Sequence, residues 1–164
     1  MIIESEREVL TMTDMNKVLV FDMDGTIADL YGVKNWLPML RAENARPYAI
    51  AKPLYDMDEL NALIRELKAE GWRIVVTTWL AKDSTRAYDN AVRQAKIEWL
   101  DRMGFDYDEI HLIKYGTTKA NCTRKLKGYQ VLVDDNEKIR KGWHLGATID
   151  PTKDLIVDLI NLLD

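Results

Sequence analysis

Two pairs of closely spaced aspartates, each directly after an apolar run, are the residues of this sequence best suited to chemistry. The segment Asp22-Met-Asp24-Gly25-Thr26 follows the run KVLVF, and Asp134-Asp135-Asn136 follows QVLV. Because alternate residues of an extended strand share a face, Asp22 and Asp24 project their carboxylates the same way. Such pairs at neighbouring strand ends repel each other unless a cation lies between them, and hard oxygen ligands of this kind suit Mg²⁺. The pattern therefore predicts a magnesium site.

The same residues could carry out phosphoryl transfer. One carboxylate can attack a phosphorus atom as nucleophile, while the other passes a proton to and from the leaving group. Gly25 allows a sharp backbone turn after the acids, and Thr26 can then offer a hydroxyl and an amide to the substrate. Phosphate-monoester hydrolysis can need an acceleration of about 10²¹-fold, of which a positioned acid supplies roughly 10²–10⁴. Further groups must therefore stabilise the charge of the phosphoryl oxygens.

A threonine and a lysine are the candidates for contacting those oxygens. Thr77 ends another apolar run, and Lys119 stands at the start of a predicted helix. Thr78 is the alternative to Thr77, since only one of two adjacent strand residues faces a given side. Lys114 and Lys82 are the alternatives to Lys119, and a solvated surface position is the ordinary role of a lysine.

Short β-branched runs alternate with amphipathic segments from Lys17 onward, which is the pattern of a parallel α/β sheet. Strands covered on both faces can be continuously apolar, as these runs are. In open α/β sheets, ligands bind beyond the carboxyl ends of the strands, where the acids and the threonine stand. The predicted strands are 17–22, 73–77, 109–113, 130–134 and 147–149.

Amphipathic helices are predicted to cover this sheet. A helix over 57–70 has Leu60, Leu63, Ile64 and Leu67 at helical spacing and ends at Gly71. Shorter helices are predicted over 34–41 and 119–127. A long helix, capped by Asp83 or Ser84 and closed by Gly104, would bury Val92, Ala95, Trp99, Leu100 and Met103. A last helix from Pro151 would bury Leu155, Ile156, Leu159 and Ile160.

One segment, 30–56, is too long for a simple strand–helix connection. We expect it to form a small cap insert over the carboxyl edge of the sheet. Its aromatic residues could stack on a nucleobase, since every base offers a π-face, or could pack the insert onto the core. Its arginines could steer an anionic substrate or serve only as surface charges. The candidate residues are Trp36, Arg41, Arg46, Tyr48 and Tyr55.

The motifs and their order resemble those of the haloacid dehalogenase (HAD) superfamily over about 17–149. The segment from Asp22 to Thr26 resembles its first motif, Thr77 its second, Lys119 its third, and Asp134-Asp135 its fourth. The resemblance implies a three-layer Rossmann-like core whose five strands, numbered along the chain, lie in the order 5-4-1-2-3. It implies that Asp22 forms an aspartyl-phosphate and that Asp24 acts as general acid and then as base. It also implies that Asp22, the Asp24 backbone carbonyl and Asp134 hold Mg²⁺.

The function that this resemblance implies is Mg²⁺-dependent phosphomonoester hydrolysis. Within the superfamily the chain looks most like the 5′(3′)-deoxyribonucleotidases, with the phosphatase domains of polynucleotide repair enzymes as a second likeness. A nucleotide or a 3′-phosphorylated oligonucleotide end is the expected substrate. The alternatives are a phosphotransferase that uses the same aspartyl-phosphate, and a binding or regulatory protein that has lost catalysis. Asp135 is expected either to support the metal ligands or to cap the helix after it.

Length and composition fit one globular domain. The 164 residues are 47% hydrophobic and 30% charged, which excludes disordered and collagen-like classes, and the apolar runs are too short to cross a bilayer. A net charge of −4 argues against stable binding of duplex DNA. The single cysteine, Cys122, excludes an internal disulfide, so the reducing cytoplasm is the expected compartment.

We expect a loose arm over 1–16, in which Met12 or Met15 could begin translation, and one domain over 17–164. The oligomeric state is left open.

Overall fold

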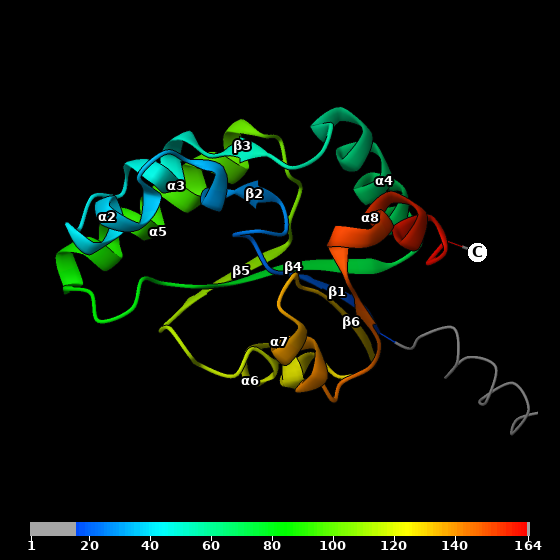
Figure 1. Cartoon of the computed structure of the whole chain (residues 1–164). Helices are drawn as coiled ribbons and strands as arrows, with labels where there is room; N and C mark the ends of the chain where they lie inside the picture. Colours follow the sequence, from blue (N-terminus) through cyan, green and yellow to red (C-terminus); the bar gives the residue numbers. More distant parts are fainter. Residues whose placement is uncertain (1–15, 164) are drawn as a thin grey trace, which may run out of the picture.

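The computed structural model describes residues 16–163, so the predicted arm lies, except for Asn16, outside the described residues. Within this range, one sheet of five parallel strands runs through the middle of the molecule (Figure 1). Its strands are β1 (Lys17–Phe21), β4 (Trp72–Trp79), β5 (Glu109–Ile113), β6 (Tyr129–Val133) and β7 (Thr148–Ile149). The predicted α/β class and parallel sheet are confirmed.

The order across the sheet is β5-β4-β1-β6-β7. These labels differ from the predicted 5-4-1-2-3 because two short strands that were not predicted, β2 (Ala28–Asp29) and β3 (Lys52–Pro53), pair antiparallel in a separate sheet. If β2 and β3 are left out, the five strands of the main sheet can be numbered one to five along the chain. Starting from the β7 edge, their order across the sheet is then 5-4-1-2-3. The first strand is therefore central, with β4 and β6 on its two sides.

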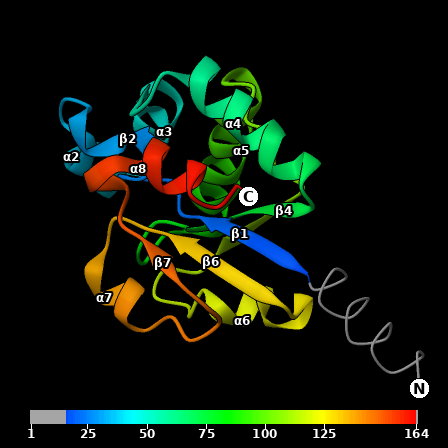
Figure 2. The same ribbon diagram turned by 90° about the vertical axis from the view of Figure 1, so that its right-hand side faces the viewer.

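Helices cover both faces of the sheet, which makes three layers (Figures 1 and 2). On one face lie α4 (Met57–Ala69), α5 (Arg86–Arg102) and α8 (Pro151–Ile160). On the other face lie α6 (Ala120–Thr123), the 3₁₀ turn η2 (Arg124–Leu126) and α7 (Glu137–Lys141). No helix within residues 16–163 is long and apolar enough to span a membrane.

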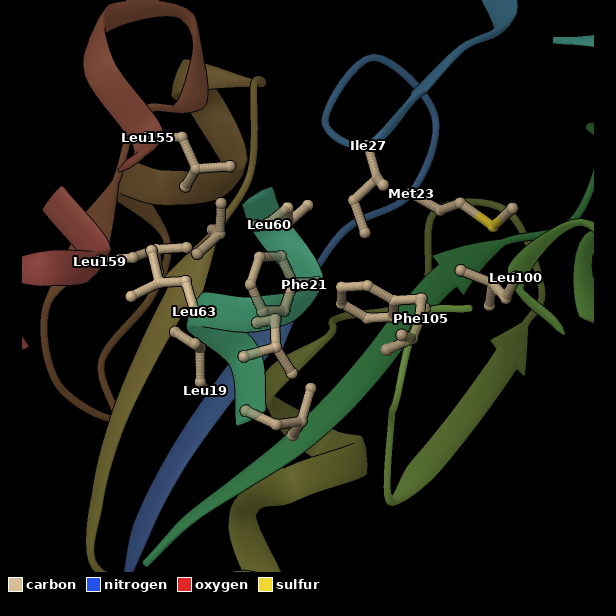
Figure 3. Packing of buried hydrophobic residues seen from close by; sticks show 14 of the residues in the cluster. Leu19, Phe21, Met23, Ile27, Leu60, Leu63, Leu100, Phe105, Leu155 and Leu159 are labelled. Carbon is tan, nitrogen blue, oxygen red and sulfur yellow. The ribbon is translucent and has the colours of Figure 1, made fainter. Parts of the chain in front are cut away.

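Alternate residues of the central strand supply the cores of the two faces. Leu19 and Phe21 point toward α4 and α8 and pack on leucines of those helices (Figure 3). Phe105, just after α5, meets Phe21 edge to face with ring centroids 5.3 Å apart. Val18 and Val20 point the other way, into the cluster with Leu132 and Trp143. Asp22, the next residue after Phe21, continues this alternation and lies on the side of Val18 and Val20.

The predicted insert, 30–56, contains the 3₁₀ turn η1 (Leu30–Gly32), α2 (Trp36–Arg41), α3 (Arg46–Ile50) and β3, and β2, which pairs with β3, lies just before it. The predicted helix over 34–41 corresponds to α2, whereas α3 was not predicted. Tyr48 and Leu30 pack against Leu80, Tyr88 and Val92, so the segment is attached to the molecule mainly through the long helix α5.

Several local predictions were wrong. The cap of α5 is Thr85, whose side chain accepts from the Tyr88 amide, rather than Asp83 or Ser84. Ile160, the last residue of α8, has an exposed side chain, whereas Leu155 and Leu159 of the same helix are buried as predicted. Asn136, rather than Asp135, caps the following helix α7, so helix capping is not the role of Asp135.

Candidate active site

The acidic residues converge at the carboxyl ends of the two central strands. Phe21, the last residue of β1, pairs with Val76 of β4 and Val133 of β6. Asp22 and Asp134 therefore leave the sheet at the same level, on adjacent strands. Together with Asp135 they bring carboxylate oxygens within 4.8 Å of one another.

A buried lysine joins two of these acids. Lys119 lies at the start of α6, and its Nζ donates to Asp22 Oδ1 and to Asp134 Oδ2, each at 2.7 Å. Burial alone would lower the pKa of Lys119, but the two carboxylates outweigh it and raise that pKa, so the ammonium stays charged. The structure thus brings this lysine, rather than Lys114, into the acidic cluster.

Three carboxylates of the site have a raised pKa, because they are buried and lie close to other acids. Burial raises the pKa of Asp24, although the ammonium of Lys96, a residue of α5, opposes the shift. Burial, followed by the charge of Asp22, raises the pKa of Asp134. The same two causes, in the same order, raise the pKa of Asp135 to about 7. A bound cation would relieve this repulsion.

The charge balance of the site fits a divalent cation. Within the described part of the chain, the ammonium groups of Lys96 and Lys119 form ion pairs with the acids of this site. The acids supply four carboxylates, those of Asp22, Asp24, Asp134 and Asp135. Full ionisation therefore leaves an excess of two negative charges, which one divalent ion would balance. The donors are all hard carboxylate oxygens, the type that Mg²⁺ prefers. The residues present therefore fit magnesium.

Thr26 and Gly25 shape the loop that carries the first acids. The Thr26 hydroxyl lies 3.0 Å from Asp22 Oδ2 and 3.2 Å from Asp135 Oδ1, and it also accepts from the Asp135 amide. This side chain is fully buried, so it supports the carboxylates and does not line the cavity as a substrate contact. Gly25 has φ +78°, and an added Cβ would lie 2.6 Å from Asp135 Oδ2. Only glycine fits this close approach.

The two threonines of β4 face opposite sides, as their adjacency requires. Thr77 follows Val76 and is level with Asp22 and Asp134, and its buried hydroxyl has no hydrogen-bond partner among residues 16–163. Thr78 lies on the α5 side, where its hydroxyl accepts a hydrogen bond of 2.8 Å from a lysine of that helix, Lys96. Thr78 also lines the cavity described below. Thr77 is therefore near the acidic cluster, but Thr78 lines the cavity.

That lysine, Lys96 of α5, is a site residue that sequence reasoning missed. Its fully buried Nζ donates to Asp24 Oδ2, to Thr78 Oγ1 and to the Trp79 carbonyl, each at 2.8 Å. A signal was present, because Lys96 lies four residues after Val92 and therefore on the apolar stripe of the predicted helix. A lysine on a buried stripe needs a partner.

A cavity of about 550 Å³ opens beside these residues. Of the predicted substrate contacts, Trp36, Arg41, Tyr48 and Thr78 line it, whereas Arg46 does not. Tyr55 instead donates its hydroxyl to the Pro151 carbonyl and packs on the core. Lining residues that were not predicted include Tyr31, Trp79 and Tyr115. Lys82, one of the alternatives to Lys119, also lines the cavity.

Two aromatic pairs stand in the cavity wall. Tyr31 and Trp36, both from the insert, have ring centroids 5.0 Å apart, as do Trp79 and Tyr115 at the ends of β4 and β5. Lys82 lies 6.0 Å above the Tyr115 ring. The wall is thus aromatic and cationic, while the floor is acidic.

Comparisons with known proteins give structural matches alone, because no family model and no curated protein matches the sequence. A chain of the Pnkp1/Rnl/Hen1 RNA repair complex superposes with a TM-score of 0.56 at 17% identity, over 84% of this chain and 42% of that one. This protein therefore spans less than half of that chain. The D,D-heptose 1,7-bisphosphate phosphatase of Burkholderia thailandensis superposes with a TM-score of 0.54 at 14% identity, over 91% of this chain and 99% of that one. These similarities show a shared fold.

Proposed function

We propose that this protein is a Mg²⁺-dependent phosphomonoester hydrolase of the HAD superfamily. The observation that carries the proposal is the convergence of Asp22, Asp24 and Asp134 with Lys119 at the carboxyl ends of adjacent parallel strands. The shared fold with a bisphosphate phosphatase supports it.

The proposed reaction has two steps. First, a carboxylate oxygen of Asp22 forms a bond to phosphorus while the bond from phosphorus to the leaving oxygen breaks, and Asp24 gives its proton to that oxygen. Burial raises the pKa of Asp24, which suits a group that must hold a proton. Second, Asp24 takes a proton from water as the water oxygen attacks phosphorus, and the bond to Asp22 breaks to release phosphate.

The remaining groups hold the reacting atoms and balance their charge. Lys119 orients Asp22 against Asp134 through its two 2.7 Å hydrogen bonds. Of the two threonines of β4, Thr78 lines the cavity and is our candidate for contacting a phosphoryl oxygen, whereas Thr77, level with Asp22, is fully buried and does not line it. Asp22, Asp134 and the Asp24 backbone carbonyl would hold Mg²⁺, with Asp135 close enough to be a further ligand. When bound, Mg²⁺ would stabilise the negative charge of the phosphoryl group.

The substrate that fits this cavity best is a phosphate ester with a planar aromatic group, and we propose a nucleotide or a 3′-phosphorylated oligonucleotide end. Trp36 and Tyr115 offer aromatic surface for a base, and Arg41 and Lys82 offer positive charge beside the acidic floor. The fold shared with a chain of an RNA repair complex adds support for a polynucleotide end.

Phosphate release from 4-nitrophenyl phosphate tests the reaction. We expect release with Mg²⁺, loss of release with EDTA, and loss of turnover in Asp22→Asn without loss of the fold, which circular dichroism would check. Turnover retained by Asp22→Asn would refute the nucleophile assignment, and the absence of Mg²⁺-dependent release from a broad phosphate panel would refute the hydrolase. A panel of nucleotides, 3′-phosphorylated oligonucleotides and sugar phosphates, with Asp22→Asn as blank, then identifies the substrate class. An oligonucleotide substrate should lose affinity steeply with salt.

A further inference from the structure

Lys96 is a fully buried lysine whose ammonium is saturated with hydrogen bonds. An ammonium carries three donors, and those of Lys96 are directed to Asp24 Oδ2, Thr78 Oγ1 and the Trp79 carbonyl, each at 2.8 Å. A buried charge is costly unless it is paired and hydrogen-bonded, so each of these contacts is needed to keep it there. The ammonium is therefore fixed rather than free to follow a ligand.

The surroundings of Lys96 fix its position from several elements. Val92 and Trp99, one turn before and after it on α5, are fully buried and anchor the helix. The Tyr48 ring, from the insert, lies 4.9 Å from Nζ and is itself buried. Asp24, in contrast, stands in a loop after β1 and lines the cavity. In this contact the lysine is the fixed member and the aspartate is the one that is oriented.

We propose that Lys96 is a positioning residue for proton transfer, which holds Asp24 Oδ2 so that Oδ1 carries the proton to and from the substrate. The proposal rests on the proposed phosphatase function. As the bond from phosphorus to the leaving oxygen breaks, the proton moves from Asp24 to that oxygen, and Asp24 is left as a carboxylate. Its negative charge then lies beside the Lys96 ammonium, which the fold has already placed there.

Among residues 16–163, Lys96 pairs with one carboxylate alone. Lys119 contacts Asp22 and Asp134, whereas the carboxylate that Lys96 contacts is Asp24. Loss of Lys96 should therefore impair the proton transfer that Asp24 performs, and spare both the nucleophile and the cation site. A merely structural lysine would affect every substrate equally.

Leaving-group dependence separates these two roles. The nucleoside monophosphate that the wild type hydrolyses fastest releases its nucleoside as an alkoxide, which needs a proton. By contrast, 4-nitrophenyl phosphate releases 4-nitrophenolate, a stable anion that does not need one. We expect Lys96→Met to lower kcat/KM by about 10- to 100-fold for the nucleotide, which is less than the full effect of roughly 10²–10⁴-fold that a positioned acid supplies, because Asp24 itself remains. For 4-nitrophenyl phosphate we expect kcat/KM to change less than about threefold, because kcat/KM reports only the steps up to the first irreversible one.

An epistasis control covers the case in which Lys96→Met alone does not fold. Asp24→Asn and the double variant Asp24→Asn/Lys96→Met should have equal kcat/KM for each substrate, because the lysine acts through the aspartate. A further fall in the double variant would overturn the proposal, as would an equal fall, or no fall, for both substrates in Lys96→Met. A wild type that releases no phosphate from either substrate would overturn the proposed function and this role with it, whereas the other outcomes concern Lys96 alone.

Discussion

Binding of Mg²⁺ should stabilise this protein more at pH 8 than at pH 6, because a proton competes with the cation for Asp135. Burial and the charge of Asp22 raise the pKa of Asp135 to about 7, and its oxygen lies within 4.8 Å of ligand oxygens of Asp22 and Asp134. Without metal, a raised carboxyl pKa contributes stability that is full below its unfolded value near 4 and is lost as the pH rises through 7. The cation reverses this trend, since it binds the ionised form.

The size of the effect follows from the proton competition. At pH 6, a group with a pKa of about 7 is about 90% protonated, and at pH 8 it is about 10% protonated. The apparent Kd for Mg²⁺ should therefore be about tenfold weaker at pH 6, which is worth about 1.4 kcal/mol at a saturating concentration. For a chain of this length, that corresponds to about 3–6 °C in Tm.

Thermal unfolding with and without Mg²⁺, at matched ionic strength and at both pH values, measures this difference. Subtracting the metal-free Tm at each pH cancels the titration of groups far from the cluster. Asp135→Asn serves as the control, and its Mg²⁺-induced shift should depend less on pH. A wild-type shift that is equal at the two pH values, or larger at pH 6, would show that the proton and the cation do not compete at this cluster.

Three further predictions concern the core, the loop and the cavity wall. Phe105→Ala should lower the free energy of unfolding in urea by about 3–5 kcal/mol, because it removes the buried ring beside Phe21, and should leave the Mg²⁺-induced Tm shift unchanged. Gly25→Ala should weaken Mg²⁺ binding in isothermal titration, since the added Cβ would lie 2.6 Å from Asp135 Oδ2; unchanged affinity would contradict this. Tyr115→Ala should raise KM about 5- to 100-fold for a nucleotide, as expected for a lost stacking partner, and less for a sugar phosphate; equal changes would argue against stacking.

The strands and the acids at their ends could be predicted because both depend on local sequence. A run of β-branched residues covered on both faces has few alternatives to a central parallel strand, and β1 and β6 begin and end within one residue of the predicted bounds 17–22 and 130–134. Once Phe21 pairs with Val133, the register places Asp22 beside Asp134 without further information. Two short apolar runs and two acid pairs thus place most of the acidic cluster.

Features that depend on distant contacts could not be predicted in this way. The segment Asp83-Ser-Thr85 offers three adjacent capping side chains, and local preference does not choose among them. Thr85 caps α5, and its hydroxyl also donates to Glu43 of the insert, far away in sequence, while Asp83 adopts a positive φ of 53°. The cavity wall is similar, since Trp79 and Tyr115 meet only because β4 and β5 are neighbours.

The two buried lysines divide the acids of the site into groups with separate tasks. Lys119 compensates the carboxylates that face each other across β1 and β6, and these are the ones that a divalent cation would share. Lys96 compensates Asp24 from the opposite side of the sheet, through a helix that does not carry any of the other acids. Because the ammonium groups belong to different elements, each can be removed while the other keeps its partners. If this division is correct, Lys96→Met should retain the Mg²⁺-induced Tm shift of the wild type even as its turnover of alkyl phosphates falls, a combination that a general loss of packing around α5 would not produce.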